Sequence, residues 1–283
     1  MGKKEVIDRC RACGTLAALS WEHVPPRAAP NKNTHIELTF EQAIRLGPDD
    51  IPKGPQRQGG VQFPTLCGRC NNTFGRLYVP SLNEWYWGGR YILQQAEAMG
   101  LDAAAFQARN VYPLRIIKAI IAMFLAINPE RFRTEPGGAA LAQLLADSSA
   151  KELPEGVKFY TYFNHTGELR YIPLSEVKYN VTEETTIEDL VLGPRLRASE
   201  ITFPPYGFLM ALTTEGIDPR LFDISAFAEF DYDQQTTVAV ELAVLPTHIG
   251  VLFNDYRTYE EVKRDEQRNV EAAIALGIDP DTI

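Results

Sequence analysis

The chain has 283 residues, of which 45% are hydrophobic and 23% are charged, and its formal net charge is −9. This length suffices for one large domain or two small ones, and the acidic balance argues against simple electrostatic binding of nucleic acid by the whole molecule. The longest apolar stretch, Ile116 to Ile127, spans about three helical turns and contains Lys118, so we expect a buried helix and no membrane-spanning segment.

The charge is unevenly distributed along the chain. Residues 1–90 carry 12 Lys and Arg against 8 Asp and Glu, whereas residues 91–283 carry 16 against 29. Two solvated surfaces of different composition would account for this difference. The functional explanation is a head that binds a polyanion, attached to a body with another task.

Four cysteines form two CxxC pairs, Cys10 with Cys13 and Cys67 with Cys70. Two such turns supply the four thiolates of a tetrahedral site, so we predict a structural Zn²⁺ held by these residues. A disulfide framework is the competing interpretation. It fits poorly because the N-terminus has no secretory signal, and we expect a reducing cytoplasm. A redox function needs only one pair in a βαβ context, and the chain meets neither condition.

Between the pairs, Thr15 to Trp21 predicts a short strand that leads into Glu22-His23-Val24-Pro25-Pro26. Two successive prolines cannot continue a strand ladder, so we expect His23 at a strand end, where its side chain can face a cleft. Local signals predict the elements that follow: a helix over Thr39–Leu46 capped by Thr39, a mobile loop over residues 52–60, a strand over Val61–Leu66, and a helix over Asn71–Tyr78 that Pro80 stops.

In their order, the first CxxC pair, Glu-His-Val-Pro-Pro and Cys-Gly-Arg-Cys-Asn-Asn resemble the HNH endonucleases that have a zinc-stapled ββα-metal fold. The resemblance covers roughly residues 8–80. It implies a metal-dependent endonuclease that hydrolyses phosphodiester bonds of DNA. In such enzymes a histidine activates water, and a single divalent cation stabilises the developing charge.

The resemblance also implies roles for individual residues. It makes His23 the general base and makes Glu22 and Asn71 ligands of a catalytic Mg²⁺ or Mn²⁺, while Gln62 replaces the Asn that usually orients the base. The chemistry agrees, because histidine suits a base near neutral pH, and carboxylate and amide oxygens suit Mg²⁺ while thiolates suit Zn²⁺. The alternative for Asn71 and Asn72 is capping of the helix after the second CxxC pair.

The rest of the chain predicts an α+β protein with a mostly antiparallel sheet or small barrel. We expect an HNH domain (1–80), a helical segment (81–150) and an α+β C-terminal domain (151–283). The expected helices are Leu82–Met99 with Ser81 as cap, one that begins at Tyr112-Pro113, Gly137–Ala146 and Thr258–Gly277. The expected strands are Val157–Phe163, Glu168–Ile172, Ala198–Phe203, Tyr206–Leu212, Ile224–Phe230 and Thr236–Leu245.

These observations predict an HNH endonuclease that acts on DNA. Its acidic C-terminal region would gate the head, bind a regulatory protein partner or form a homo-oligomer. The combination resembles bacterial restriction or antiphage defence effectors. The alternative is a non-catalytic zinc-stapled module that binds nucleic acid or protein, and a further one is a zinc head that only builds an oligomer interface.

Overall fold

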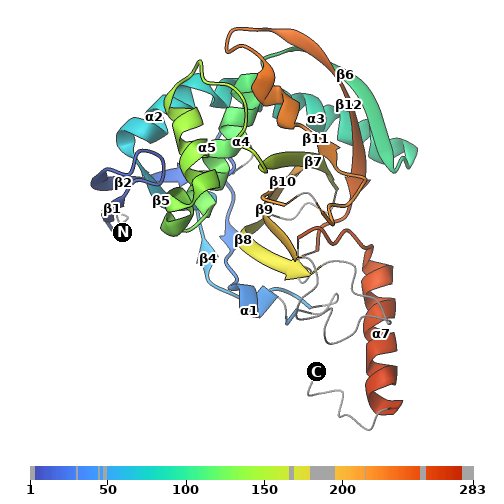
Figure 1. Cartoon of the computed structure of the whole chain (residues 1–283). Helices are drawn as coiled ribbons and strands as arrows, with labels where there is room; N and C mark the ends of the chain where they lie inside the picture. The colour runs from blue at the N-terminus through green and yellow to red at the C-terminus, as the bar shows by residue number, and fades with distance from the viewer. Residues whose placement is uncertain are drawn as a thin grey trace.

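The computed structural model describes residues 4–29, 31–43, 45–46, 50–165, 169–178, 195–213, 215–248 and 253–275. It is an α+β structure whose sheets are mostly antiparallel, as the sequence predicts. A small sheet lies at the left of Figure 1 and a large sheet lies at its centre and right, with helix α4 (Pro113–Ile127) between them.

The small sheet contains the histidine-bearing strand. Its order is β1-β2-β5, with β1 at Ile7–Arg9, β2 at Leu16–His23 and β5 at Gln62–Cys67, and all pairs are antiparallel. Helix α2 (Gly68–Leu77) follows β5 directly and packs against both β2 and β5. The prediction that His23 ends a strand is therefore confirmed.

The segment between β2 and β5 is more ordered than predicted. It holds β3 (His35–Ile36), α1 (Phe40–Ala43) and β4 (Gln56–Arg57), and β3 pairs with β4. The expectation of a loop over residues 52–60 is thus wrong at β4. Thr39 does cap α1, because its Oγ1 accepts from the Gln42 amide (3.2 Å) while the Gln42 side chain accepts from the Thr39 amide (2.9 Å).

Helix α3 (Val79–Met99) begins earlier than predicted. Pro80 lies in its first turn, where a missing N–H does no harm, so this proline starts α3 rather than stopping a helix. Ser81 is buried and does not cap. Strand β6 (Ala103–Val111) then follows within the segment predicted as helical. Its alanines favour helix locally, but pairing with β12 overrides that preference.

The large sheet has the order β6-β12-β7-β10-β9-β8, and β11 also pairs with β7. Its remaining strands are β7 (Lys158–Asn164), β8 (Arg170–Lys178), β9 (Arg195–Phe203), β10 (Tyr206–Ala211), β11 (Phe222–Asp223) and β12 (Thr236–Leu245). The pairing of β12 with β7 is parallel, and the others are antiparallel.

The strand predicted at Ile224–Phe230 is instead a 3₁₀ helix, η2 (Ser225–Glu229). The Asp223 carboxylate accepts a hydrogen bond from the Ser225 amide at 2.7 Å, and the Ser225 hydroxyl accepts one from the Phe159 amide at 3.0 Å. A side chain that binds the backbone two residues ahead forms a turn and competes with strand pairing. That local turn explains why these apolar residues do not form the predicted β-strand.

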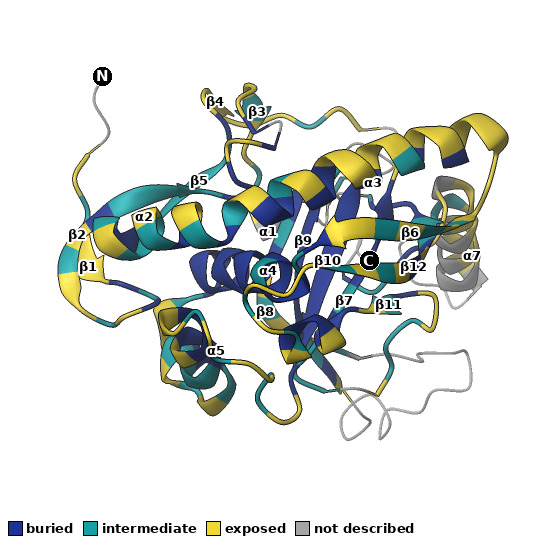
Figure 2. Ribbon diagram, turned by 90° about the horizontal axis from the view of Figure 1, so that it is seen from above, coloured by how far each residue is buried: buried dark blue, intermediate teal, exposed yellow. Residues whose placement is uncertain are grey.

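Helix α4 forms the centre of the core, as its apolar sequence predicts. Every residue from Pro113 to Ile127 except Arg115 is buried, and Figure 2 shows the helix buried along its length. A helix that is apolar all round is stable only when other elements surround it. The surrounding elements include α3, β5, β8, β9, η2 and α5 (Pro136–Ala146). One core cluster accordingly runs from Cys10 to Leu242.

The interior of α4 also holds a lysine. Lys118 donates from Nζ to the carbonyls of Asp147 (2.6 Å) and Ser148 (3.0 Å), just beyond the end of α5. Burial lowers the pKa of this ammonium group to about 8. The hydrogen bonds compensate for its desolvation, so α4 can be buried on all sides despite one charged residue.

The C-terminal helix α7 (Tyr259–Ala275) extends away from the body in Figure 1. Its predicted end, Gly277, lies outside the described residues, as does Glu168 of the predicted β8. The side chains of Thr258 and Glu261 cap the helix reciprocally, with hydrogen bonds of 2.7 and 3.3 Å to each other's amides. Within the described residues, no helix combines the length and apolar character that a bilayer crossing requires.

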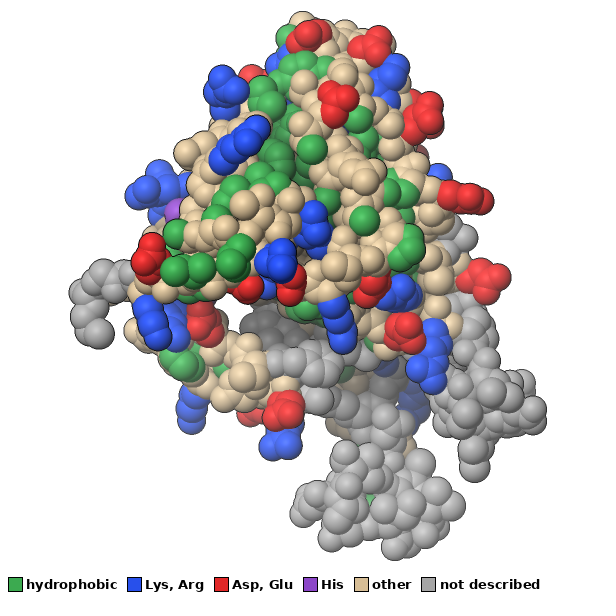
Figure 3. All heavy atoms as spheres, turned by 60° about the vertical axis from the view of Figure 1, so that its left-hand side comes forward, with side chains coloured by type: hydrophobic (Ala, Val, Ile, Leu, Met, Phe, Trp, Pro, Cys, Tyr) green, Lys and Arg blue, Asp and Glu red, His purple; other side chains and the backbone are tan. Residues whose placement is uncertain are grey.

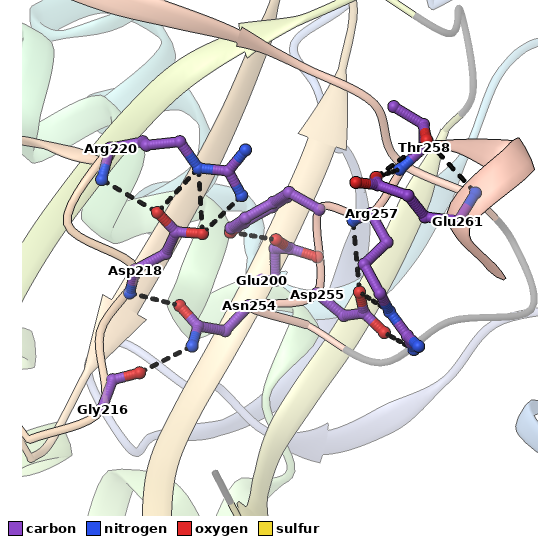
Figure 4. A network of polar contacts seen from close by, with 10 residues as sticks. Glu200, Gly216, Asp218, Arg220, Asn254, Asp255, Arg257, Thr258 and Glu261 are labelled. Carbon is purple, nitrogen blue, oxygen red and sulfur yellow. Dashed lines mark hydrogen bonds and ion pairs between the residues drawn. The ribbon is translucent and has the colours of Figure 1, made fainter. Parts of the chain in front are cut away.

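The segment before α7 is held on the large sheet by the polar network of Figure 4. Asn254 binds the Asp218 amide (3.0 Å) and the Gly216 carbonyl (2.7 Å), and the Tyr256 hydroxyl donates to the Glu200 carboxylate at 3.0 Å. Glu200 is fully buried and forms an ion pair with Arg170. These contacts fix the chain that enters α7 to strand β9 and to the loop that follows β10.

Candidate metal and catalytic site

The four cysteines come together in one cluster. Their Sγ atoms lie within 4.8 Å of one another, and the Sγ atoms of Cys13 and Cys67 are 3.8 Å apart. Tetrahedral coordination with Zn–S bonds of about 2.3 Å requires S···S separations of about 3.8 Å. All four thiols are free, so the disulfide framework is not formed. The cluster is compatible with a structural zinc ion.

Each CxxC pair is positioned by local backbone structure. The first pair lies in the β1–β2 turn, where the Gly14 amide donates to the Cys10 carbonyl (2.8 Å) and Gly14 has a positive φ of 75°. In the second pair, Cys67 is the N-cap of α2 and Cys70 lies in its first turn. The positive end of a helix dipole favours thiolates at this position.

Hydrogen bonds between the thiols shift their pKa values in opposite directions. A hydrogen bond with Cys70 lowers the pKa of Cys10 to about 4, and the same hydrogen bond raises the pKa of Cys70. One thiolate is thus stabilised by its neighbours. A bound cation would hold all four groups as thiolates, because metal coordination replaces their protons.

The first CxxC turn is also fastened to the body of the protein. The Arg11 guanidinium donates to the Ala126 carbonyl at the end of α4 (2.5 Å), and Arg133 donates to the Ala12 carbonyl (3.3 Å). The Arg133 guanidinium also packs so closely on Gly14 that a Cβ added there would lie only 2.4 Å from it. The two arginines therefore fasten the first CxxC turn to the end of α4 and to the chain that follows it.

Asn71 is held against β2 through Ser20. The Asn71 Nδ2 atom donates to the Ser20 hydroxyl at 2.9 Å, and this hydroxyl donates to the Leu66 carbonyl at 2.8 Å. Glu22 follows Ser20 by two residues on β2, beyond a shift in the β2–β5 register that lies between Ser20 and Trp21. Among the described residues, no hydrogen bond or ion pair engages the Asn71 Oδ1 atom or the Glu22 carboxylate. Each of these two residues therefore keeps an oxygen that a cation could bind.

Burial raises the pKa of Glu22 to about 7. Desolvation is the whole cause, since no neighbouring charge or hydrogen bond stabilises the carboxylate. A carboxylate in this condition gains more than an exposed one from a nearby cation. The environment of Glu22 therefore suits a group that is neutral or metal-bound.

His23 has Gln62 directly opposite in the β2–β5 ladder, and Glu22 has Phe63 opposite. Opposed residues in an antiparallel pair have Cβ atoms about 4.5–5.5 Å apart, so the Gln62 side chain lies beside the imidazole. Gln62 also donates from Nε2 to the Gly59 carbonyl at 2.8 Å. Strand alternation gives His23 and Glu22 opposite faces of β2. The predicted residues therefore form two pairs, Glu22 with Asn71 and His23 with Gln62, on opposite faces of the end of this strand.

Two arginines of α2, Arg69 and Arg76, are exposed, as is Asn72. Figure 3 brings forward the side of the molecule on which β1, β2 and α2 lie, and its Lys and Arg side chains are interspersed with Asp and Glu. Any contact with a polyanion here would rest on a few local arginines rather than on a continuous basic surface.

Sequence reasoning missed the residues that hold the turn after His23. Asn31 is buried and binds the Pro25 carbonyl (2.6 Å), the Val61 carbonyl (3.0 Å) and the Val61 amide (2.7 Å). The Tyr171 hydroxyl, on β8, donates to the Val24 carbonyl at 2.6 Å. The only signal in the sequence was Gly59-Gly60, because both glycines have positive φ and Gly60 touches Asn31.

Comparison of the chain with protein-family models, with curated proteins and with solved structures found no match. The resemblance to the HNH endonucleases therefore rests on the sequence motifs alone: the two CxxC pairs, Glu22-His23-Val24-Pro25-Pro26 and the asparagines after Cys70.

Proposed function

We propose that this protein is a metal-dependent endonuclease of the HNH type that hydrolyses phosphodiester bonds of DNA. One observation carries the proposal. Glu22 and His23 end strand β2, Asn71 is hydrogen-bonded to Ser20 of the same strand, and the cysteine cluster joins the start of this strand to the helix that bears Asn71. In a reducing cytoplasm the cluster would hold Zn²⁺ in a structural role.

In the proposed reaction, His23 accepts a proton from the attacking water while Gln62 orients the imidazole. The water oxygen forms a bond to phosphorus, and the phosphorus–oxygen bond to the leaving strand breaks. Glu22 and Asn71 would hold Mg²⁺ or Mn²⁺, which when bound stabilises negative charge on the leaving oxygen. Arg69 and Arg76, exposed on α2, would contact neighbouring phosphates.

The body would restrain this activity. Residues 91–283 carry 29 Asp and Glu against 16 Lys and Arg, and such a surface repels DNA until a regulatory protein partner or a second copy covers it. We propose on this basis a gated nuclease of the kind that restriction and antiphage defence systems use.

The test is nicking of supercoiled plasmid in Mg²⁺ or Mn²⁺ by wild type, His23→Ala and Glu22→Gln. We expect nicking by wild type and a loss of about 10²–10⁴-fold in His23→Ala, the usual contribution of a general base. His35→Ala is the matched control, because His35 lies between the same two strands of the chain, on β3, with its Nε2 atom 3.7 Å from the Glu37 carboxylate. Equal rates for wild type and His23→Ala would refute the proposal.

The second candidate is a non-catalytic zinc-stapled module that binds nucleic acid or protein. The excess of basic residues over residues 1–90 favours it, as does the placement of His23 and Glu22 on opposite faces of β2. Wild-type protein that binds DNA but never nicks it, under varied metal, salt and partner conditions, would support this module instead.

A further inference from the structure

We infer that Tyr171 is a positioning residue for the proposed site, so that the large sheet sets the geometry of the histidine-bearing strand. This inference rests on the proposed nuclease function. Tyr171 lies on β8, well over a hundred residues from His23 in the sequence, and no motif points to it.

Tyr171 touches both strands of the proposed site. Its hydroxyl donates to the carbonyl of Val24, the fully buried residue that follows His23, at 2.6 Å. Its ring packs edge-on against Phe63, with ring centroids 5.6 Å apart. Phe63 is opposite Glu22 in the β2–β5 ladder and follows Gln62. One side chain therefore holds the backbone beside His23 and the strand that carries Gln62.

Tyr171 can act as an anchor because β8 is itself held rigidly. Its neighbour Arg170 is buried and forms an ion pair with Glu200, whose carboxylate also accepts from the hydroxyls of Tyr162 (3.1 Å) and Tyr256 (3.0 Å). Further along β8, the Leu174 amide donates to the side chain of Asn128 at the end of α4 (2.5 Å). Because β8 is fixed in this way, the Tyr171 hydroxyl has a defined position, and its hydrogen bond can position the Val24 carbonyl.

Loss of this hydroxyl would leave the buried Val24 carbonyl without its side-chain donor and let the end of β2 relax. A displacement of about 1 Å at a catalytic group can lower a rate about 10²-fold without affecting substrate binding. Tyr171→Phe is expected to lower the nicking rate constant about 10–100-fold. The Kd for DNA should change less than about twofold, because no DNA-contacting group is removed.

The experiment compares full-length wild type, Tyr171→Phe and Tyr206→Phe. Tyr206 is the matched control, because its buried hydroxyl also donates to a main-chain carbonyl, that of Trp85 at 3.0 Å, away from His23. Both variants should lose similar thermal stability, but only Tyr171→Phe should lose nicking. The imidazole NMR signals of His23, assigned with His23→Ala, should shift in Tyr171→Phe and stay unchanged in Tyr206→Phe.

Unchanged His23 signals and wild-type nicking in Tyr171→Phe would overturn the inference, as would an equal loss of nicking in Tyr206→Phe. If wild type itself does not nick DNA, the proposed function fails, and the NMR comparison still decides whether Tyr171 positions His23. Should Tyr171→Phe fail to fold, Phe63→Leu replaces it. That variant removes the ring contact and keeps the hydroxyl bond, and it should lower nicking several-fold with unchanged Kd.

Discussion

The burial of Glu22 makes the stability of the protein depend on pH. Its carboxyl pKa is raised from 4.5 to about 7, so between these values the folded state binds the proton more tightly than the unfolded state does. Stability therefore falls as pH rises through this window. At about 1.4 kcal/mol for each unit of difference in pKa, the penalty at high pH is at most about 3.5 kcal/mol, and partial exposure reduces it to about 2 kcal/mol.

Glu22→Gln removes this penalty, because glutamine is neutral in both states and has almost the same shape. We expect the variant to exceed wild type in free energy of unfolding by about 2 kcal/mol near pH 8, and the advantage to shrink by about 1–2 kcal/mol near pH 5.5. Urea unfolding of both proteins at both pH values, without added divalent cation, measures this difference in free energy of unfolding. Glu84→Gln is the control, since Glu84 is exposed on α3. An advantage of Glu22→Gln that does not change with pH would refute the assignment of the raised pKa to Glu22.

Three further predictions concern the framework of the site. Cys67→Ser should lower the zinc content below one ion per chain, measured by elemental analysis, and lower the melting temperature; full zinc content would argue against the cluster as the site. Glu200→Gln should cost about 3–5 kcal/mol in urea unfolding, because it leaves the buried Arg170 charge uncompensated, and a loss below about 1 kcal/mol would contradict this. Gly60→Ala should lower the free energy of unfolding by about 1–3 kcal/mol, because Gly60 has a positive φ and a Cβ there would lie 2.1 Å from the Asn31 carbonyl oxygen. Gly75→Ala, in the exposed part of α2, is the control and should be neutral or stabilising.

Several features followed from the sequence because their signals are local. The spacing of two CxxC pairs predicted the cysteine cluster, two prolines predicted the end of β2 at His23, and an unbroken apolar run predicted the buried helix α4. Thr39 and Gln42 predicted the start of α1. The prolines and the Thr39–Gln42 cap act on backbone within a few residues of themselves. The two CxxC pairs are far apart in the sequence, but their thiols suit the same metal ion.

The tertiary structure decided what depends on distant partners. Residues 103–111 form β6 only because β12 pairs with them, and a separate long-range pairing places β12 parallel to β7. The Tyr171 hydroxyl reaches Val24 from β8, so nothing near either residue could predict the contact. Local sequence determines caps, turns and ligand spacing, whereas burial and strand pairing depend on which distant surfaces meet. The four thiols were therefore found from the sequence, and the support behind His23 only from the fold.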